Sequence, residues 1–202
     1  MNNAISLLLW VLVGYLFGSI PTGYWLGKLK GIDLTKVGSG STGATNVLRE
    51  LGKGPAIITL TVDVLKGFFP VFYSIKLQGN ELIVVLTAIA CVFGHSKSIF
   101  LNFKGGKSSA TGLGILMAIS WKIALITFLI WIIVVYTSKY SSLGSIVSVP
   151  LAPLLLYLSH KPFIYVALTI IAAAYIVLIR HRENIQRLLK GTEPKIGSSS
   201  NL

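Results

Sequence analysis

The chain has 202 residues, of which 53% are hydrophobic and only 12% are charged, and its mean hydropathy is +0.77. Soluble domains carry about 25% charged residues, so this composition excludes a soluble globular domain and indicates an integral membrane protein. The formal net charge of +12 does not indicate a nucleic-acid-binding groove, because the basic residues lie between apolar segments, where they are typical of orientation signals, phospholipid contacts or sites for anionic substrates.

Apolar segments separated by polar turns predict an all-α membrane protein with about seven transmembrane helices and glycine-rich cytosolic loops. One of these helices is expected to be short or re-entrant, because a full crossing takes about 20 residues. The expected segments are residues 4–28, 56–76, 81–100, the short 110–120, 122–138, 143–158 and 163–179. We expect a single membrane domain over residues 1–197, and residues 198–202 are expected to be a disordered tail or a cloning remnant.

The distribution of basic residues predicts the orientation. Fourteen Lys and Arg residues lie on one side of the expected spans, three lie on the other side, and Lys66 lies within a span. The positive-inside rule therefore predicts an N-terminus outside and a C-terminus in the cytosol. The glycine-rich loops and the basic tail then share the cytosolic side.

The polar loop over residues 29–53 contains Gly-Ser-Gly-Ser-Thr-Gly-Ala-Thr-Asn at residues 38–46, followed by Arg49. Its glycines permit sharp turns, its hydroxyl groups and backbone N–H groups are donors, and a guanidinium suits bidentate binding of an oxyanion. This chemistry predicts a phosphate cradle, although it lacks the Walker spacing. The alternative is a flexible loop.

A second polar stretch, residues 102–109, contains Lys104, Gly105, Gly106 and Lys107 and leads directly into the short helix. The N-terminal amides of that helix are expected to face an anion. The alternative is a basic loop that only sets orientation.

Asp63 and Lys66 lie one helical turn apart within the second span. Ionised groups in that position cost several kcal/mol unless they are paired, and they usually mark function. We expect a pair, with either a structural or a functional role.

The basic tail after the last span contains His181, Asn184 and Arg187 at spacings that place them near one face of a helix. A tail of this kind often acts only as a topology anchor. A histidine and an asparagine have no use in that role, so their presence favours a binding or catalytic site.

Several kinds of chemistry are not indicated. The three histidines are far apart and lack Cys or carboxylate neighbours at ligand spacing, so no metal site is predicted. No His-x-x-x-x-Asp pair and no Gly-x-Ser-x-Gly elbow occur, and the single cysteine, Cys91, excludes a disulfide within the chain. No cofactor is expected.

These dispersed motifs resemble those of the bacterial acyl-phosphate:glycerol-3-phosphate acyltransferases (PlsY type) over nearly the whole chain. The motifs that carry the resemblance are residues 18–21, 38–46 with Arg49, Asp63 with 65–67, 94–95, 103–107 with 110–111, 142–144, 182–184 with 187–188, and 191–193. Ser41-Thr42 stand where the family more often has Asn-Pro, Lys97-Ser98 stand where it usually has Phe-Pro, and Ser108 replaces a common glycine.

The resemblance implies an enzyme of the bacterial inner membrane that transfers an acyl group from acyl phosphate to the 1-hydroxyl of glycerol 3-phosphate. The products would be lysophosphatidic acid and phosphate, at the first step of phospholipid synthesis. The implied partners are acyl phosphate, glycerol 3-phosphate, membrane lipid and the enzyme that supplies acyl phosphate, and no nucleic acid. Because acyl phosphate is already activated, a direct displacement needs no protein nucleophile.

The resemblance also implies the site. Glycerol 3-phosphate would be held by Ser39, Arg49, Lys107, His181 and Asn184, of which Lys107, His181 and Asn184 would be catalytic. Acyl phosphate would be held by Gly40, Ser41, Thr42, Gly43, Asn46, Lys104, Gly105, Gly106 and Ser142. Asn184 would orient the acceptor hydroxyl. Two questions stay open: which loop holds which phosphate, and whether the departing phosphate or a protein group takes the proton.

Two other classes of protein share some of these features. A transporter for a phosphorylated metabolite would also have broken helices and intramembrane charges, but it would be expected to show an inverted repeat, which is absent here. A membrane scaffold that binds anionic lipid would leave the ordered glycines unexplained.

Overall fold

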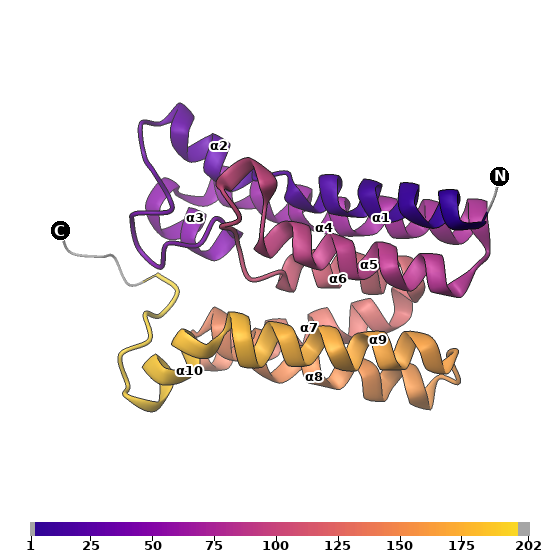
Figure 1. Cartoon of the computed structure of the whole chain (residues 1–202). Coiled ribbons are helices and arrows are strands. Elements are labelled where there is room, and N and C mark those ends of the chain that lie inside the picture. Colours follow the sequence, from indigo (N-terminus) through magenta and orange to yellow (C-terminus); the bar gives the residue numbers. More distant parts are fainter. Residues whose placement is uncertain (1–2, 198–202) are drawn as a thin grey trace. The chain divides into compact units, whose positions relative to one another are not determined.

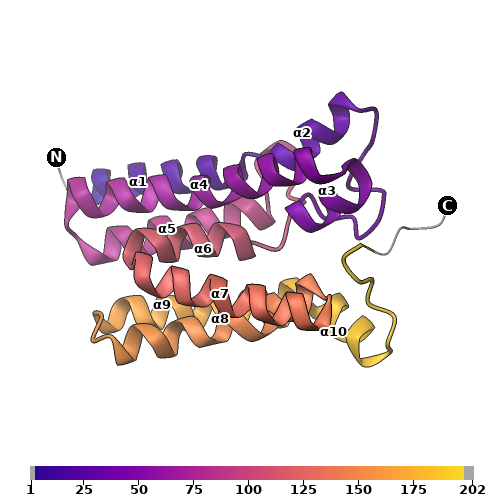
Figure 2. The same ribbon diagram turned by 180° about the vertical axis from the view of Figure 1, so that it is seen from behind.

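The computed structural model describes residues 3–197, and within these residues all regular secondary structure is helical (Figures 1 and 2). The all-α prediction is therefore confirmed. The chain divides into two compact units, with the boundary in the sequence after Trp121. Residues 198–202, the expected tail or remnant, lie outside the described residues, and the single domain over 1–197 stays a prediction.

The first unit is a bundle with a smaller helical element at one end. Figures 1 and 2 show α1, α4, α5 and α6 running lengthwise beside one another, with α2 and α3 together at one end of these helices. Helix α1 packs on α4 and α5, α4 packs on α5 and α6, and α3 packs on α2 and α4. The helices are α1 (Asn3–Ser19), α2 (Thr22–Leu29), α3 (Ala44–Leu51), α4 (Lys53–Gln78), α5 (Glu81–Ser96), the 3-10 turn η1 (Ile99–Leu101) and α6 (Ser109–Ile119).

The first expected span, residues 4–28, is not one continuous helix. It breaks between Ser19 and Thr22 because Pro21 has no backbone N–H and disfavours a helical conformation at Ile20. The polar loop expected over residues 29–53 also differs, since its last part forms α3. Helix α3 has apolar residues on one face, and Val47 and Leu51 pack with Leu34 in a small core.

The third expected span, residues 81–100, ends earlier than predicted. Helix α5 stops at Ser96 because the chain folds back on the end of the helix, where the Ser98 N–H donates to the Lys104 carbonyl (3.0 Å) and the Gly106 N–H donates to the His95 carbonyl (3.1 Å). The prediction of a short helix over residues 110–120 is confirmed, since α6 has 11 residues. Pro55 lies in the first turn of α4, where its missing N–H leaves no helical hydrogen bond unmade.

Small residues allow α4 and α6 to pack at close range. A Cβ atom at Gly67 would collide with the Thr111 carbonyl oxygen, and one at Gly114 would collide with the Val64 carbonyl oxygen. Such small-residue contacts are typical of helices that pack within membranes.

The second unit contains α7 (Trp121–Ser138, of which residues 122–138 lie in this unit), α8 (Ser141–Leu158), α9 (Phe163–Ala174), the π-helical turn η2 (Tyr175–Arg180) and α10 (Arg182–Leu189). Helix α8 packs on α9 and η2, and η2 packs on α10. The wide turn η2 closes with the His181 N–H donating to the carbonyl of Ile176, five residues earlier (3.0 Å). Turns of this kind often occur next to functional sites.

Five helical segments of the described chain are long and apolar enough to cross a membrane: Ala4–Leu29, Lys53–Gln78, Trp121–Ser138, Ser141–Leu158 and Phe163–Arg180. Helices α5 and α6 are apolar but shorter. The expected total of about seven crossings therefore stays a prediction.

Candidate functional site

The glycine-rich loop of the first unit folds around the side chain of Asn46, which is only 2% exposed. Its Oδ1 accepts a hydrogen bond from the Ser39 N–H (3.0 Å). Its Nδ2 donates to the carbonyl oxygens of Leu34 (3.4 Å), Val37 (3.2 Å) and Ser41 (2.9 Å). These four bonds give Asn46 the role of shaping the loop, and its predicted contact with acyl phosphate stays a prediction.

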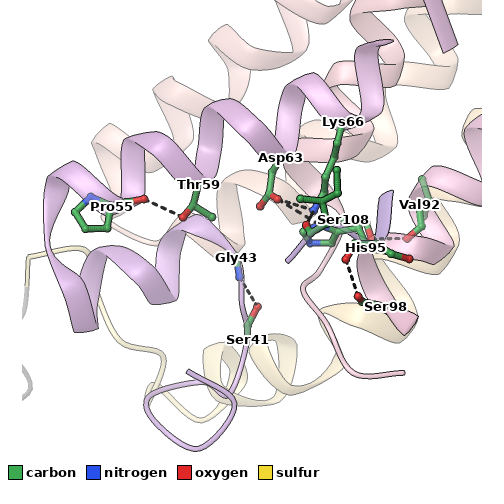
Figure 3. Close-up of polar contacts among 12 residues, drawn as sticks. Ser41, Gly43, Pro55, Thr59, Asp63, Lys66, Val92, His95, Ser98 and Ser108 are labelled. Atoms are coloured by element: carbon green, nitrogen blue, oxygen red, sulfur yellow. Dashed lines mark hydrogen bonds and ion pairs between the residues drawn. The ribbon is translucent and has the colours of Figure 1, made fainter. Parts of the chain in front are cut away.

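Gly38 is required by this arrangement. Its φ is +56°, and a Cβ there would collide with Asn46 Oδ1 and lie 2.6 Å from Glu50 Oε1. Further along the loop, the Ser41 hydroxyl accepts from the Gly43 N–H (3.3 Å; Figure 3). Gly43 is the N-cap of α3 and has no side-chain cap, so the loop leads into the amide end of a helix. That end is a favourable place for an anion.

Asp33 stabilises the entry to the loop. Its carboxylate accepts from the hydroxyl (2.7 Å) and the N–H (3.1 Å) of Thr35, and it pairs with Lys28 (3.1 Å). The hydrogen bond from the Thr35 hydroxyl, followed by the one from Lys28, lowers the pKa of Asp33 to about 2. Arg49 follows Asn46 by one turn on α3 and is partly exposed.

The second glycine-containing stretch is held against the end of α5. Ser98, which precedes the stretch, donates to the Ser19 carbonyl (2.6 Å), and Ser108, near the end of the stretch, donates to the Val92 carbonyl (2.9 Å), so the chain is tied to buried backbone on both sides of the glycines (Figure 3). Gly106 packs directly on the imidazole of His95, since a Cβ at Gly106 would collide with the Nε2 atom. Lys104 is exposed and Lys107 is partly exposed between these anchors.

Asp63 and Lys66 form an ion pair inside the first unit, with Lys66 Nζ 2.7 Å from Asp63 Oδ1 and each side chain 3% exposed (Figure 3). Lys66 also donates to the Ile20 carbonyl (2.8 Å), which has no helical partner because α1 breaks there. The Nδ1 atom of His95 lies 3.6 Å from the same Asp63 oxygen. The pair therefore joins α4 to the end of α1 and to the end of α5.

In the second unit, the buried carboxylate of Glu193 accepts hydrogen bonds from three polar side chains. Glu193 Oε1 accepts from the Ser142 hydroxyl (2.6 Å) and from Asn184 Nδ2 (2.6 Å), and Oε2 accepts from Arg187 Nε (2.7 Å). Helix α8 supplies Ser142, α10 supplies Asn184 and Arg187, and the segment after α10 supplies Glu193. His181 is buried beside α10, and its Nδ1 lies 2.9 Å from the Ile176 carbonyl oxygen.

Comparison with known proteins decides the family. The sequence profile described as glycerol-3-phosphate acyltransferase matches residues 8–191. The chain belongs to the glycerol-3-phosphate acyltransferase family. A "Glycerol-3-phosphate acyltransferase" of Synechococcus sp. (strain JA-3-3Ab) is 49% identical to it over 194 residues, which are 96% of this chain and 95% of the relative. A "Glycerol-3-phosphate acyltransferase 2" of Thermotoga maritima is 50% identical over 189 residues, 93% of this chain and 95% of that one.

The acyltransferase is also similar to a solved structure. The glycerol 3-phosphate form of PlsY (YgiH), an integral membrane glycerol 3-phosphate acyltransferase, superposes with a TM-score of 0.91 at 42% identity and 96% coverage of each chain. The form of PlsY described as the lysphosphatidic acid form gives a TM-score of 0.88 at 40% identity and 96% coverage of each chain. The present chain is therefore a multi-pass integral membrane acyltransferase.

The structure brings together some of the site residues predicted for this acyltransferase. Ser39, Ser41 and Gly43 lie in one loop around Asn46. Ser142 and Asn184 meet at Glu193. The residues assigned to glycerol 3-phosphate are divided between the units, with Ser39, Arg49 and Lys107 in the first and His181 and Asn184 in the second. Their common role stays a prediction.

Two residues of the acyltransferase that organise these clusters, Glu193 and His95, belong to motifs that carry the resemblance but were left out of the predicted binding residues, although the place of His95 near the cytosolic end of the third expected span is compatible with a pore-facing or site-facing role. Glu193 belongs to a Gly-Thr-Glu motif at the end of a basic tail, and an acid beside a glycine turn in that tail was the available signal. His95 has no carboxylate near it in the sequence, and its neighbour Asp63 lies on a different helix. Among residues 3–197, no three His, Cys, Asp or Glu side chains gather in a group that could hold a metal ion.

Acidification of the acyltransferase is expected to remove stability supplied by Glu193. Burial alone would raise the pKa of this carboxyl, but the hydrogen bonds from Ser142, Arg187 and Asn184 outweigh burial and hold it below its ordinary value of 4.5. A carboxyl with a lowered folded-state pKa contributes stability above its unfolded-state pKa, and this contribution is lost as the pH falls through the folded-state pKa. The difference in Tm between wild type and Glu193→Gln in detergent should therefore hold from neutral pH to about 4.5 and shrink below it. A difference that widens on acidification would contradict this assignment.

Proposed function

We propose that this protein transfers an acyl group from acyl phosphate to the sn-1 hydroxyl of glycerol 3-phosphate, giving lysophosphatidic acid and inorganic phosphate. The observation that carries the proposal is the structural similarity, over 96% of this chain, to PlsY (YgiH). The two solved structures of that enzyme are described as its glycerol 3-phosphate form and its lysphosphatidic acid form. One is an acyl acceptor and the other is its acylated product. Acyl phosphate as donor is supported by the resemblance of the two glycine-containing loops to those of the PlsY-type enzymes.

The reaction is a single displacement. The hydroxyl oxygen of glycerol 3-phosphate attacks the acyl carbon, a new ester C–O bond forms, and the bond from that carbon to the phosphate oxygen breaks. The phosphate leaves with the bonding electron pair and accepts the hydroxyl proton. Because the donor is already activated, the protein has to orient the two substrates and neutralise their charges.

Roles follow for the residues of each unit. In the first unit, Ser39, Arg49 and Lys107 bind glycerol 3-phosphate, and the donor phosphate is bound by Gly40, Ser41, Thr42, Gly43, Asn46, Lys104, Gly105 and Gly106. In the second unit, His181 and Asn184 bind glycerol 3-phosphate, Asn184 orients its hydroxyl, and Ser142 contacts the donor. Lys107, His181 and Asn184 are the proposed catalytic residues.

Trapping with acyl-labelled acyl phosphate tests the proposal. Purified protein should release phosphate only when glycerol 3-phosphate is present, and the label should appear in lysophosphatidic acid. After incubation without acceptor and denaturation, the protein should carry no stoichiometric label. A burst of phosphate with covalently retained label would mean a double displacement, with Ser39, Ser41 or Ser142 as the nucleophile. Absence of label in any lipid product would overturn the proposed reaction.

Replacing Arg49 by alanine is expected to weaken the binding of glycerol 3-phosphate. A hydrogen bond to a charged group contributes about 1.5–3 kcal/mol, so the KM for glycerol 3-phosphate should rise by about 10- to 150-fold with a much smaller change in kcat. Steady-state kinetics at saturating acyl phosphate measures both constants. Lys36→Ala removes an exposed cation of the same loop and should leave the KM unchanged. An equal rise in KM in the two variants would mean that only the net charge of the loop affects the binding of glycerol 3-phosphate.

We further propose that the protein lies in the bacterial inner membrane with its N-terminus outside and its C-terminus and glycine-containing loops in the cytosol. The support is the fourteen-to-three distribution of basic residues. In a background in which the buried Cys91 is replaced by alanine, cysteines at Lys53 and Lys190 should react with an impermeant thiol reagent only from the cytosolic side. A cysteine at Gln78 should react only from outside. Labelling of position 53 from outside would show that the protein has the opposite orientation.

A further inference from the structure

The buried network of Asp63, Lys66 and His95 is a group of ionisable side chains that the proposed reaction does not use. All three side chains are at most 5% exposed. Burying charged groups costs several kcal/mol unless they are paired and hydrogen-bonded. Because of this cost, a buried network inside a membrane protein usually has a structural or functional role, and its contacts indicate which one.

The network has a fixed end on the backbone of the first unit. Lys66 Nζ donates to the Ile20 carbonyl (2.8 Å) and lies 2.7 Å from Asp63 Oδ1 (Figure 3). The carbonyl belongs to the break before Pro21, and both side chains belong to α4. The Asp63 carboxylate is therefore held in one orientation by an ammonium group that is itself held by backbone.

The other end of the network is the imidazole of His95. Its Nδ1 edge lies 3.6 Å from Asp63 Oδ1, which is too long for a hydrogen bond but close enough for an electrostatic contact. Its Nε2 edge touches Gly106, where a Cβ would collide with it. The ring therefore lies between the carboxylate and the glycine. The backbone adds a second tie at the same place, because the Gly106 N–H donates to the His95 carbonyl (3.1 Å).

We infer that Asp63, Lys66 and His95 are positioning residues for the stretch Lys104–Lys107, and that the imidazole is the wedge which sets the position of Gly106. This inference rests on the proposed function, in which that stretch binds phosphate groups. The network touches no substrate. It acts by fixing the backbone and the two ammonium groups of the stretch at the distance that a phosphate requires, so a loss of the wedge weakens binding before it affects the chemical step.

A double-mutant cycle between the wedge and the glycine tests the inference. His95→Ala removes the support beneath Gly106, and Gly106→Ala puts a methyl group into the ring. Each single variant should raise the KM for one phosphate-bearing substrate at least tenfold, and this change should be larger than the accompanying fall in kcat. The double variant places the methyl group in the space vacated by the ring, so it should bind better than Gly106→Ala alone.

Hydrogen exchange gives a readout that does not depend on activity. In His95→Ala, the amides of residues 104–108 should exchange at least tenfold faster than in wild type, while the Tm in detergent changes by only a few degrees. Ser74→Ala is the matched control, because the buried Ser74 hydroxyl bonds only within α4, to the Val71 carbonyl (2.8 Å). This variant should match wild type in KM and in exchange.

A second variant covers the case in which His95→Ala does not fold. Asp63→Leu combined with Lys66→Met removes both charges, and a fold usually tolerates the replacement of a buried ion pair by hydrophobic residues. This double variant should show the same faster exchange at residues 104–108. The inference is overturned if His95→Ala or this double variant keeps wild-type exchange and KM, or if the losses in the cycle are strictly additive. A wild type that transfers no acyl group overturns the proposed function instead, and the exchange data still decide whether the network positions the stretch.

Discussion

Replacing Asp63 by alanine is expected to lower the free energy of unfolding by about 3–5 kcal/mol, because breaking a buried ion pair leaves an uncompensated charge. The Lys66 ammonium would keep its bond to the Ile20 carbonyl but lose the carboxylate 2.7 Å away, in a position where its side chain is 3% exposed. Thermal or denaturant unfolding of the detergent-solubilised protein measures this loss. Thr59→Val, which removes a buried hydroxyl bonded within α4 to the Pro55 carbonyl (2.8 Å), is the control and should cost only about 0.5–1.5 kcal/mol.

The double variant Asp63→Ala/Lys66→Ala identifies the origin of the loss. Removing both charges removes the unpaired one, so the double variant should be more stable than Asp63→Ala alone. The interaction energy from the cycle should exceed about 0.5 kcal/mol. Strictly additive losses would show that the two residues stabilise the protein independently, and the pair would then need a different explanation.

Replacing Asn184 by alanine is expected to lower kcat by about 10²–10³-fold, the size of effect seen when one preorganised polar group is removed from a reacting centre. The structure supports this expectation because Asn184 Nδ2 donates to Glu193 Oε1 at 2.6 Å, which fixes the amide plane and directs its carbonyl oxygen away from the carboxylate. An oxygen held in one direction can accept a hydrogen bond from a substrate hydroxyl without reorganisation. Steady-state kinetics with both substrates saturating measures the change.

Gln186→Ala is the matched control for this variant, because Gln186 lies on the same helix but is exposed. Its kcat should equal that of wild type. The Asn184→Ala protein should retain its Tm within a few degrees, so that a lower kcat reports on chemistry. An increase in KM with an unchanged kcat would mean that Asn184 binds substrate without orienting it.

The helices of this protein were largely predictable because local rules decide them. Pro55 marks the first turn of α4, and the short apolar run before Trp121 predicts the half-length α6. The i, i+3 spacing of Asp63 and Lys66 predicts that the two side chains can meet. In each case the decisive information lies within a few residues.

The features that were missed depend on residues far apart in the chain. Glu193 accepts from Ser142 across 51 positions, so no periodicity could show that an acid in a basic tail is buried. His95 meets Asp63 only because α5 packs on α4. The division of the first span at Pro21 had a local signal, but an apolar run on both sides of a proline is also compatible with a kinked helix.

The break at Pro21 has a consequence for how the protein is made. It leaves the Ser19 and Ile20 carbonyls to be satisfied by side chains, and their donors are Ser98, 79 residues later, and Lys66, 46 residues later. When the first helix leaves the ribosome, neither donor has been synthesised, so these two carbonyls depend on water or on the lipid interface until α4 and the segment after α5 have followed. The contacts that close the end of α1 are thus among the last of the first unit to form during synthesis, and they bring together segments that enter the membrane at different times.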